Sequence, residues 1–182
     1  MIDVRNLKKN FGSNEVLKDI SIRIEPQEVV VVIGPSGSGK STFLRCLNLL
    51  EQLTDGHVII NGVDLADKKI DINKVRTKTG MVFQHFNLFP HKTVLENLML
   101  APTKVKKVPV EEAKKHCLEL LRKVGLLDKE NAYPDSLSGG QKQLLNLASI
   151  MVMQPSVLIL DEPTSQLDPI AAQEFLKTLE KI

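Results

Sequence analysis

The sequence predicts an α/β fold, and three features of the chain lead to this prediction. Residues 29–33, Val-Val-Val-Val-Ile, form an apolar and mostly β-branched run, which is typical of a strand buried on both faces. Residues 157–160, Val-Leu-Ile-Leu, have the same character. Between these runs, roughly residues 92–153 place apolar side chains at helical spacing. A helical section that interrupts a chain of strands indicates an α/β core with an inserted helical subdomain.

The N-terminal part of the chain predicts an antiparallel β subdomain. Residues 1–30 alternate in polarity like strands, with a turn at residues 12–14, Gly-Ser-Asn. Residues 21–25 alternate with a period of two, as a half-exposed strand does. Residues 57–60 form another short strand that runs into Asn61-Gly62, and Asn-Gly is a strong hairpin signal.

The segment after the first apolar run is predicted to be a phosphate-binding loop. It matches the pattern G-x-x-x-x-G-K-[ST], and residues 42–47 begin a helical pattern directly after it. The residues of the loop are Gly34, Pro35, Ser36, Gly37, Ser38, Gly39, Lys40, Ser41 and Thr42. Glycines let the backbone wrap a phosphate, so that N–H groups and a helix N-terminus face the anion. Lys40 is expected to reach the β- and γ-phosphates of a nucleotide, and the Ser41 hydroxyl to bind Mg²⁺. The alternative is a glycine turn beside an unrelated lysine.

Two helices are predicted in the helical section. The first covers residues 93–100, with Thr93 as its cap and Glu96 at the capping-box position. Pro102 and the basic residues 104–107 are expected in a loop. The second helix covers residues 110–124 and stops at Gly125.

Polar residues follow two of the expected strands. Residues 80–83 indicate a short strand that ends at Gln84, and residues 157–160 end in Asp161 and Glu162. An acidic residue at the end of an apolar strand is the expected partner of a phosphate loop. Asp161 is expected to hold Mg²⁺, directly or through water, and Glu162 to polarise the attacking water. Without the phosphate loop, two solvated acids at a strand end would be the simpler interpretation.

A second candidate anion site lies later in the chain. Ser138 is placed to cap a helix that starts near Gln141, and Gly139 and Gly140 leave N–H groups open. One γ-phosphate cannot easily use both loops of one subunit. We therefore predict that two subunits sandwich the nucleotide, each lending its second loop to the other.

Composition excludes several classes of protein. The 182 residues include 24 basic and 22 acidic side chains, a net charge of +2, which gives no electrostatic basis for nucleic-acid binding. The two cysteines, Cys46 and Cys117, suit a reduced compartment better than a disulfide scaffold. No apolar run reaches membrane-spanning length, and the N-terminus lacks a signal-peptide core. These features predict a cytoplasmic protein whose membrane role, if any, comes through a partner.

Taken together, the motifs resemble those of ATP-binding-cassette (ABC) transporter ATPases over almost the whole chain. The phosphate loop is similar to the Walker A loop, Gln84 to the glutamine loop, and residues 158–162 to Walker B. Residues 137–141 resemble the signature motif and residues 165–168 the D-loop. The ordered set is far more specific than any single motif.

The resemblance implies a fold, a reaction and partners. It implies a P-loop nucleotide hydrolase (RecA-type) core at residues 1–91 and 154–182, and a helical subdomain at residues 92–153. It implies ATP and Mg²⁺ as ligands, with Phe11 stacked on adenine, Gln84 beside the metal and the reacting water, and the signature residues bound to nucleotide. It further implies a second ATPase subunit and transmembrane importer subunits, with residues 86–94 near the latter. The chain would then lie on the inner face of the cell membrane.

The subfamily signal is mixed. Residues 44–140, especially 80–90, resemble ATPases that import polar amino acids. From Gln141 on, Leu144 and Ser149 stand where those importers usually have arginines, and the chain is more similar to ATPases of energy-coupling-factor vitamin importers. This mixed signal leaves open a natural or engineered fusion of two parent proteins near the signature motif.

The family's switch histidine has no counterpart among the four histidines of the chain. His57, His85, His91 and His116 all precede Asp161, whereas the switch histidine follows the strand after the D-loop helix. That strand lies, in the resembling fold, between the phosphate-loop strand and the Walker B strand. We therefore expect slow hydrolysis by these 182 residues alone. A truncated or chimeric nucleotide-binding module, and a soluble cassette protein without a membrane partner, remain as alternatives; a small kinase would leave the signature loop idle.

Overall fold

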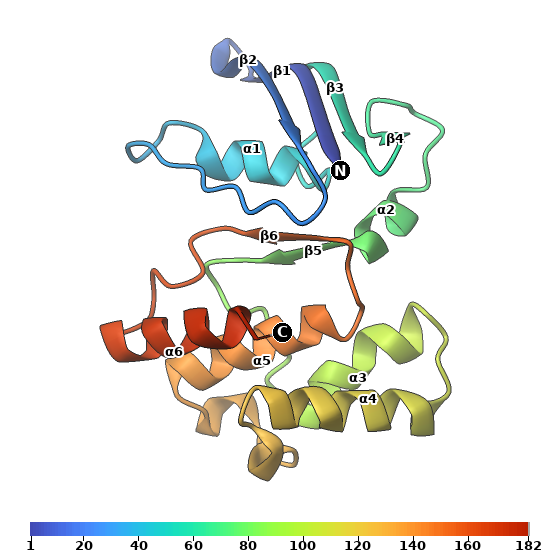
Figure 1. Ribbon diagram of the computed structural model, residues 1–182, viewed down its shortest axis with the longest axis vertical. Helices are drawn as coiled ribbons and strands as arrows, with labels where there is room; N and C mark the ends of the chain where they lie inside the picture. The colour runs from blue at the N-terminus through green and yellow to red at the C-terminus, as the bar shows by residue number, and fades with distance from the viewer. Residues whose placement is uncertain (182) are drawn as a thin grey trace. The chain divides into compact units, whose positions relative to one another are not determined.

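The computed structural model describes residues 1–181 and divides the chain into two compact units, Met1–Arg76 and Thr77–Ile182 (Figure 1). Each unit has its own sheet. The α/β fold class and the antiparallel β subdomain are confirmed. The finer boundaries of a core and a subdomain at residues 92–153 stay a prediction.

The first unit is built on a four-stranded antiparallel sheet. Its strands are β1 (Ile2–Phe11), β2 (Asn14–Ile24), β3 (Asp55–Ile60) and β4 (Val63–Asp64), in the order β2-β1-β3-β4. Asn61 and Gly62 connect β3 to β4 with φ angles of 49° and 84°, which is why Asn-Gly was informative. Two helices accompany these strands along the chain, α1 (Lys40–Cys46) and α2 (Ile72–Lys78). Several apolar side chains of β1 and β3 are fully buried, among them Val4, Leu7 and Val58.

The prediction of a buried strand at residues 29–33 is wrong. The structure gives this segment no regular secondary structure, and Val29, Val31 and Ile33 are 89, 76 and 86% exposed. The apolar pattern reports that these residues favour burial, but a strand forms only where a neighbouring strand supplies hydrogen-bond partners. Among residues 1–181, no strand pairs with this segment.

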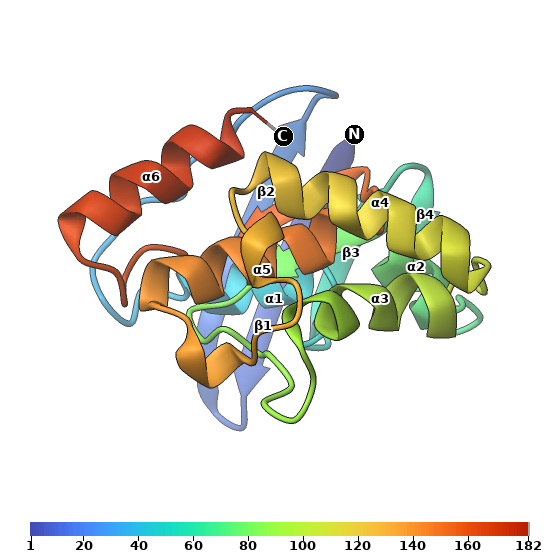
Figure 2. The same cartoon turned by 90° about the horizontal axis from the view of Figure 1, so that it is seen from below.

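The second unit contains a parallel strand pair and a layer of helices. β5 (Thr79–Val82) pairs with β6 (Val157–Leu160) in parallel, with Val82 opposite Leu160. The helices are α3 (Val94–Lys104), α4 (Val110–Lys123), α5 (Gly139–Met151) and α6 (Pro169–Leu179), with short 3₁₀ turns at Leu127–Lys129 and Pro134–Ser136. Helix α5 packs against β5, α3, α4 and α6, and Figure 2 shows it among these helices. Its buried side chains, including Leu145 and Leu147, form the centre of this unit's core.

Helix α3 differs from the prediction at its end. Pro102 was expected in a loop, but the helix continues through it to Lys104. Proline removes one N–H from the helical ladder. Here the loss falls near the C-terminus, the proline is buried, and the Thr103 hydroxyl donates to the Met99 carbonyl at 2.6 Å. Apolar packing of the buried proline therefore offsets the missing donor.

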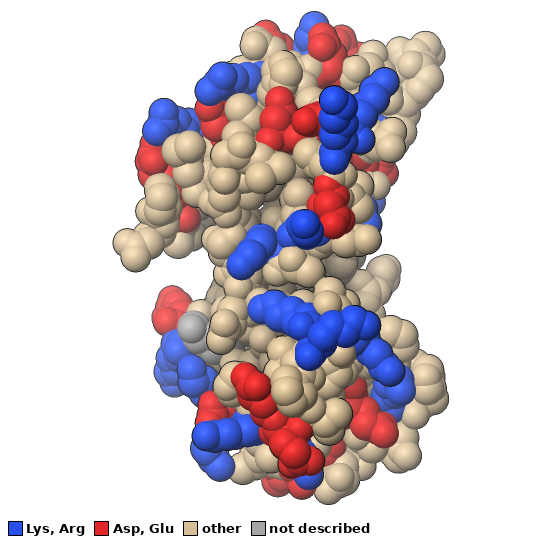
Figure 3. All heavy atoms as spheres, turned by 90° about the vertical axis from the view of Figure 1, so that its right-hand side faces the viewer, with Lys and Arg blue, Asp and Glu red and all other residues tan. Residues whose placement is uncertain are grey.

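The surface mixes charges of both signs. On the face that Figure 3 shows, Lys and Arg side chains are interspersed with Asp and Glu. This agrees with the near balance of 24 basic and 22 acidic residues. No helix within residues 1–181 is long and apolar enough to cross a membrane.

Candidate functional site

The phosphate loop leads into α1 in the first unit. Gly39 precedes the helix with a φ of 91°, and Lys40 is its first residue. The Lys40 ammonium reaches back across the loop and donates to the carbonyl oxygens of Gly34 at 2.8 Å and Pro35 at 2.9 Å. The Ser38 N–H donates to the Pro35 carbonyl at 3.3 Å. The backbone therefore curls around the one lysine that the sequence singled out.

Positions 37 and 39 of the loop favour glycine for different structural reasons. Gly37 has a φ of 77°, and a Cβ built on it would meet nothing within 4 Å. A Cβ on Gly39 would lie 3.1 Å from side-chain atoms of both Leu17 and Val16. Gly39 therefore allows the loop to approach β2 closely, whereas Gly37 meets no neighbour and is favoured by its positive φ.

The residue types at the predicted site positions fit a nucleotide with Mg²⁺. A lysine ammonium, open glycine backbone and a helix N-terminus suit phosphate oxygens. The Ser41 hydroxyl and the Asp161 carboxylate are oxygen donors, which Mg²⁺ prefers. The donor chemistry at the predicted positions therefore suits the ligands that the sequence predicted.

Phe11 lies at the end of β1 in the same unit as the phosphate loop. Its side chain is 46% exposed. The ammonium of Lys9 lies over the ring, 4.5 Å from its centroid. An exposed aromatic ring of this kind can stack on a flat base.

Gln84 and Asp161 emerge at one edge of the second unit's sheet. The strands β5 and β6 are parallel and end together, and the Asp161 N–H donates to the Val82 carbonyl at 2.9 Å. Asp161 is buried, whereas Gln84 is exposed. The structure therefore brings together these two predicted residues, which lie far apart in the sequence.

Glu162 occupies a tight turn directly after Asp161. Its φ is 48°, a left-handed conformation that is uncommon for residues with a Cβ. Its carbonyl accepts hydrogen bonds from the N–H of Ser165 at 3.2 Å and from the Ser165 hydroxyl at 2.9 Å. The turn thus holds an exposed carboxylate at the end of the strand.

The signature loop is organised by a capping box at the start of α5. The Ser138 hydroxyl accepts from the Gln141 N–H at 3.2 Å, and the Gln141 amide oxygen accepts from the Ser138 N–H at 3.0 Å. The helix begins at Gly139, two residues earlier than expected. A Cβ on Gly140 would lie 3.0 Å from the Cβ of Ala171 in α6. Gly140 therefore also permits close packing of α6, a reason that the sequence did not reveal.

Two further contacts join the motifs within the second unit. The buried Gln143 donates from Nε2 to the Pro163 carbonyl at 2.6 Å, which links the signature helix to the turn after Walker B. The Gln166 amide donates to His85 Nδ1 at 3.1 Å, which links the D-loop to the residue after Gln84. A glutamine on the apolar side of α5 was the only sequence signal for the first contact. The second had none.

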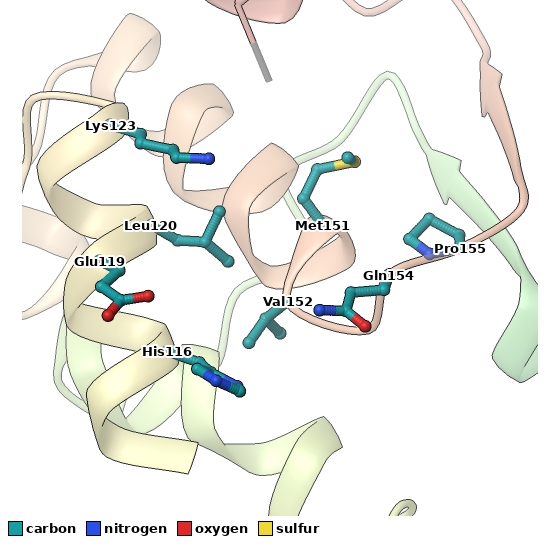
Figure 4. Close-up of a pocket in the computed structure, with 8 residues that line it drawn as sticks. All are labelled: His116, Glu119, Leu120, Lys123, Met151, Val152, Gln154 and Pro155. Carbon is teal, nitrogen blue, oxygen red and sulfur yellow. The ribbon is translucent and has the colours of Figure 1, made fainter. Parts of the chain in front are cut away.

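A separate hollow of about 460 Å³ lies between α4 and the segment after α5. Figure 4 shows that the lining side chains come from α4 on one side and from residues 151–155 on the other. Its lining residues are His116, Glu119, Leu120, Lys123, Met151, Val152, Gln154 and Pro155. None of them was predicted as a site residue, and its charged side chains are exposed.

Comparison with known protein sequences identifies the family. The family model described as ABC transporter matches residues 17–165. The chain is 54% identical over 182 residues to the arginine transport ATP-binding protein ArtM of Bacillus subtilis, covering the whole chain and 76% of that protein. It is 53% identical over 184 residues to the glutamine transport ATP-binding protein GlnQ of the same organism, with the same coverage. These relatives do not favour the alternative of an inactive nucleotide-binding module.

Solved structures give the same answer. The structure of cbiO1 from Clostridium perfringens, part of an ABC transporter complex, superposes with a TM-score of 0.89 at 31% identity, covering 99% of this chain and 72% of that one. A dimeric bacterial ABC transporter cassette superposes with a TM-score of 0.86 at 34% identity, covering 100% of this chain and 82% of that one. A post-hydrolysis state of that cassette holds ADP and phosphate. With its phosphate loop, signature and Walker B turn in the family's order, the chain belongs to the ABC transporter ATPases.

Proposed function

We propose that this ABC ATPase drives the uptake of polar amino acids. The single observation behind this substrate class is the identity of 54% and 53% to ATP-binding proteins of arginine and glutamine transport along the whole chain. The substrate itself is chosen by membrane and binding-protein partners, so the proposal names a class of substrate and not one amino acid.

The first unit contributes the residues that we propose bind the nucleotide. The backbone of residues 34–42 surrounds the phosphates, and Lys40 neutralises their charge. Phe11 stacks on the adenine. Support comes from the open glycine geometry at Gly37 and from the exposed ring of Phe11.

The residues that we propose act on the water and the metal come from the phosphate loop, the glutamine loop and the Walker B turn. Bound Mg²⁺ would neutralise phosphate charge, with Ser41, Gln84 and Asp161 as its protein-side ligands, directly or through water. Glu162 takes the proton of the attacking water, and Gln84 orients that water. This assignment rests on the motifs and on the common sheet edge of Gln84 and Asp161.

We further propose that the chain works as a dimer docked on transmembrane importer subunits. Residues 138–141 of one subunit would face the nucleotide of the other. The dimeric structure of the related cassette supports pairing. Residues 86–94, which include the exposed Phe89, would contact the membrane partner, so the chain would lie on the inner face of the membrane.

Binding of ATP tests the nucleotide site directly. We expect Lys40→Ala to weaken MgATP binding roughly ten- to hundredfold, because it removes a charge-assisted contact with phosphate. Isothermal titration calorimetry measures the affinity. Lys18→Ala, which removes an exposed lysine from β2, is the matched control and should bind ATP normally. Equal affinity of Lys40→Ala and the unchanged chain would refute the assignment.

Transport tests the substrate class. A Bacillus subtilis strain that lacks its arginine transport ATP-binding protein should regain uptake of labelled arginine when it produces this chain joined to the part of that relative that the alignment leaves uncovered. The same fusion with Lys40→Ala should not restore uptake. Restoration of ATP hydrolysis without uptake would retain the ATPase and reject this importer class.

A further inference from the structure

Lys9 is a largely buried lysine beside the exposed ring of Phe11. The residue is 9% exposed. Its ammonium donates to the Gln52 carbonyl at 2.8 Å and pairs with the Glu51 carboxylate at 3.1 Å. It also lies 4.5 Å from the centroid of the Phe11 ring. A single ammonium therefore joins β1, the segment after α1, and the ring that we propose binds the base.

The local fold fixes this arrangement. Lys9 and Phe11 are two positions apart in β1, so their side chains leave the strand on the same side. Thr54 anchors the end of the strand: its N–H donates to the Lys8 carbonyl at 2.9 Å, and its hydroxyl accepts from the Asn10 N–H at 2.9 Å. The same short segment that supplies Glu51 and Gln52 thus holds the backbone on both sides of Lys9.

The charge over the ring has a chemical consequence. A cation is attracted to the electron-rich face of an aromatic ring, and the attraction grows when the cation is shielded from water. The contact restricts rotation of the Phe11 side chain. It also draws π-electron density toward the ammonium, which reduces electrostatic repulsion between the opposite face and another aromatic ring. An exposed ring held in this way is prepared for stacking with a purine.

We propose that Lys9 is a positioning residue for recognition of the purine base. It holds and polarises the Phe11 ring from one face while adenine stacks on the other. This inference rests on the proposed nucleotide function and extends it to a residue outside every motif of the family resemblance. It predicts that Lys9 affects binding of the base and not binding of the phosphates.

The test compares MgATP with magnesium tripolyphosphate, which has the phosphates and no base. Each protein is titrated with both ligands by calorimetry, and the ratio of the two dissociation constants is the readout. An unfolded fraction binds neither ligand, so partial unfolding of a variant cancels in this ratio. Lys9→Met should lower the preference for ATP roughly two- to tenfold. Lys8→Met removes a neighbouring lysine, which is more exposed and lies 3.6 Å from Asp55, and should leave the ratio unchanged.

Two more variants separate the possible outcomes. Lys9→Arg keeps a cation over the ring and should restore the ATP preference. In a Phe11→Leu background, Lys9→Met should cause no further loss. The inference is overturned if Lys9→Met weakens the binding of both ligands equally. It is also overturned if Lys9→Met lowers the ATP preference by the same factor in the Phe11→Leu background. In either case Lys9 has only a structural role. If Phe11→Leu itself leaves the ratio unchanged, the proposed stacking fails, while phosphate binding through Lys40 remains separately testable.

Discussion

At the scale of single residues, Glu162 combines a chemical assignment with an unusual backbone. Its φ of 48° lies in the left-handed region, where a side chain costs roughly 1 kcal/mol or more relative to glycine. The turn is held by Ser165, whose N–H and hydroxyl both bond to the Glu162 carbonyl. Strain in the backbone and chemistry at the carboxylate can therefore be separated by the choice of substitution.

We expect Glu162→Gln to keep ATP binding and stability but to lower hydrolysis sharply, because the amide retains the shape and loses the base. Glu162→Gly should also lose hydrolysis but should raise stability by about 0.5–1 kcal/mol, because glycine adopts this φ without strain. Phosphate release and urea unfolding measure the two effects. Unchanged turnover in Glu162→Gln would assign the base elsewhere.

The buried thiol of Cys117 predicts a dependence of stability on pH. Burial in α4 raises the pKa of Cys117 from 9.0 to about 11. A group with a raised pKa in the folded state contributes its full stability below the unfolded pKa and loses it as pH rises through the folded value. The contribution is therefore present below about pH 9 and disappears toward pH 11.

Urea unfolding at pH 8, 9, 10 and 11 checks this effect. Cys117→Ala should be less stable at pH 8, because the substitution leaves a small cavity. Its further loss of stability between pH 9 and 11 should be smaller than that of the unchanged chain. Every other titratable group is common to both proteins, so its contribution cancels in the comparison. Parallel pH curves would show that the thiol does not titrate on unfolding.

At the scale of elements, α3 and α5 begin with the same device. Thr93 and Glu96 form a capping box on α3, and Ser138 and Gln141 form one on α5. Only the second belongs to the proposed nucleotide site. The two helices therefore offer a matched pair, in which loss of a cap can be compared with and without loss of a proposed ligand.

We expect Thr93→Ala and Ser138→Ala each to lower the free energy of unfolding by about 1 kcal/mol, because each leaves a helix N–H without its partner. Only Ser138→Ala should also lower ATP hydrolysis at saturating nucleotide. Denaturant unfolding and steady-state phosphate release measure the two effects. Similar hydrolysis in the two variants would mean that Ser138 has a structural role alone.

These elements show what can be predicted from the sequence. The capping box of Thr93 and Glu96, the helix cap at Ser138 and the Asn61-Gly62 turn were predictable because the interacting groups lie within a few residues of each other. The contact of Gln143 with Pro163 spans 20 residues, and that of His85 with Gln166 spans 81. Periodicity and motif spacing describe only nearby residues, so they cannot predict contacts between residues that are distant in the sequence. Pro102 was wrongly predicted to lie in a loop. Proline costs a helix one backbone hydrogen bond, and the sequence did not show that burial of Pro102 offsets this cost.

At the scale of the whole molecule, the two expected buried strands have different outcomes. Residues 157–160 form β6 because β5 supplies a parallel partner. Residues 29–33 have an equally apolar pattern but remain exposed and unpaired within residues 1–181. The pattern predicted the preference of both segments, and the availability of a partner strand decided between them.

The exposed segment predicts aggregation of the 182-residue chain. Short β-branched runs of low charge readily pair with copies of themselves. Val31→Lys should therefore lower light scattering at 37 °C severalfold, because a charge opposes such pairing. Val105→Lys changes an exposed valine outside the run and is the control. If both variants scatter light like the unchanged chain, residues 29–33 do not drive the association.

The close approach of Gly140 to Ala171 couples the signature loop to the position of α6. Because a Cβ at position 140 would lie 3.0 Å from the Ala171 Cβ, a side chain there would require α6 to move by a few tenths of an ångström. Glycine at position 140 therefore serves the close packing of α6 as well as the signature loop. A helix with no proposed contact to nucleotide thus inherits a constraint from a loop that has one.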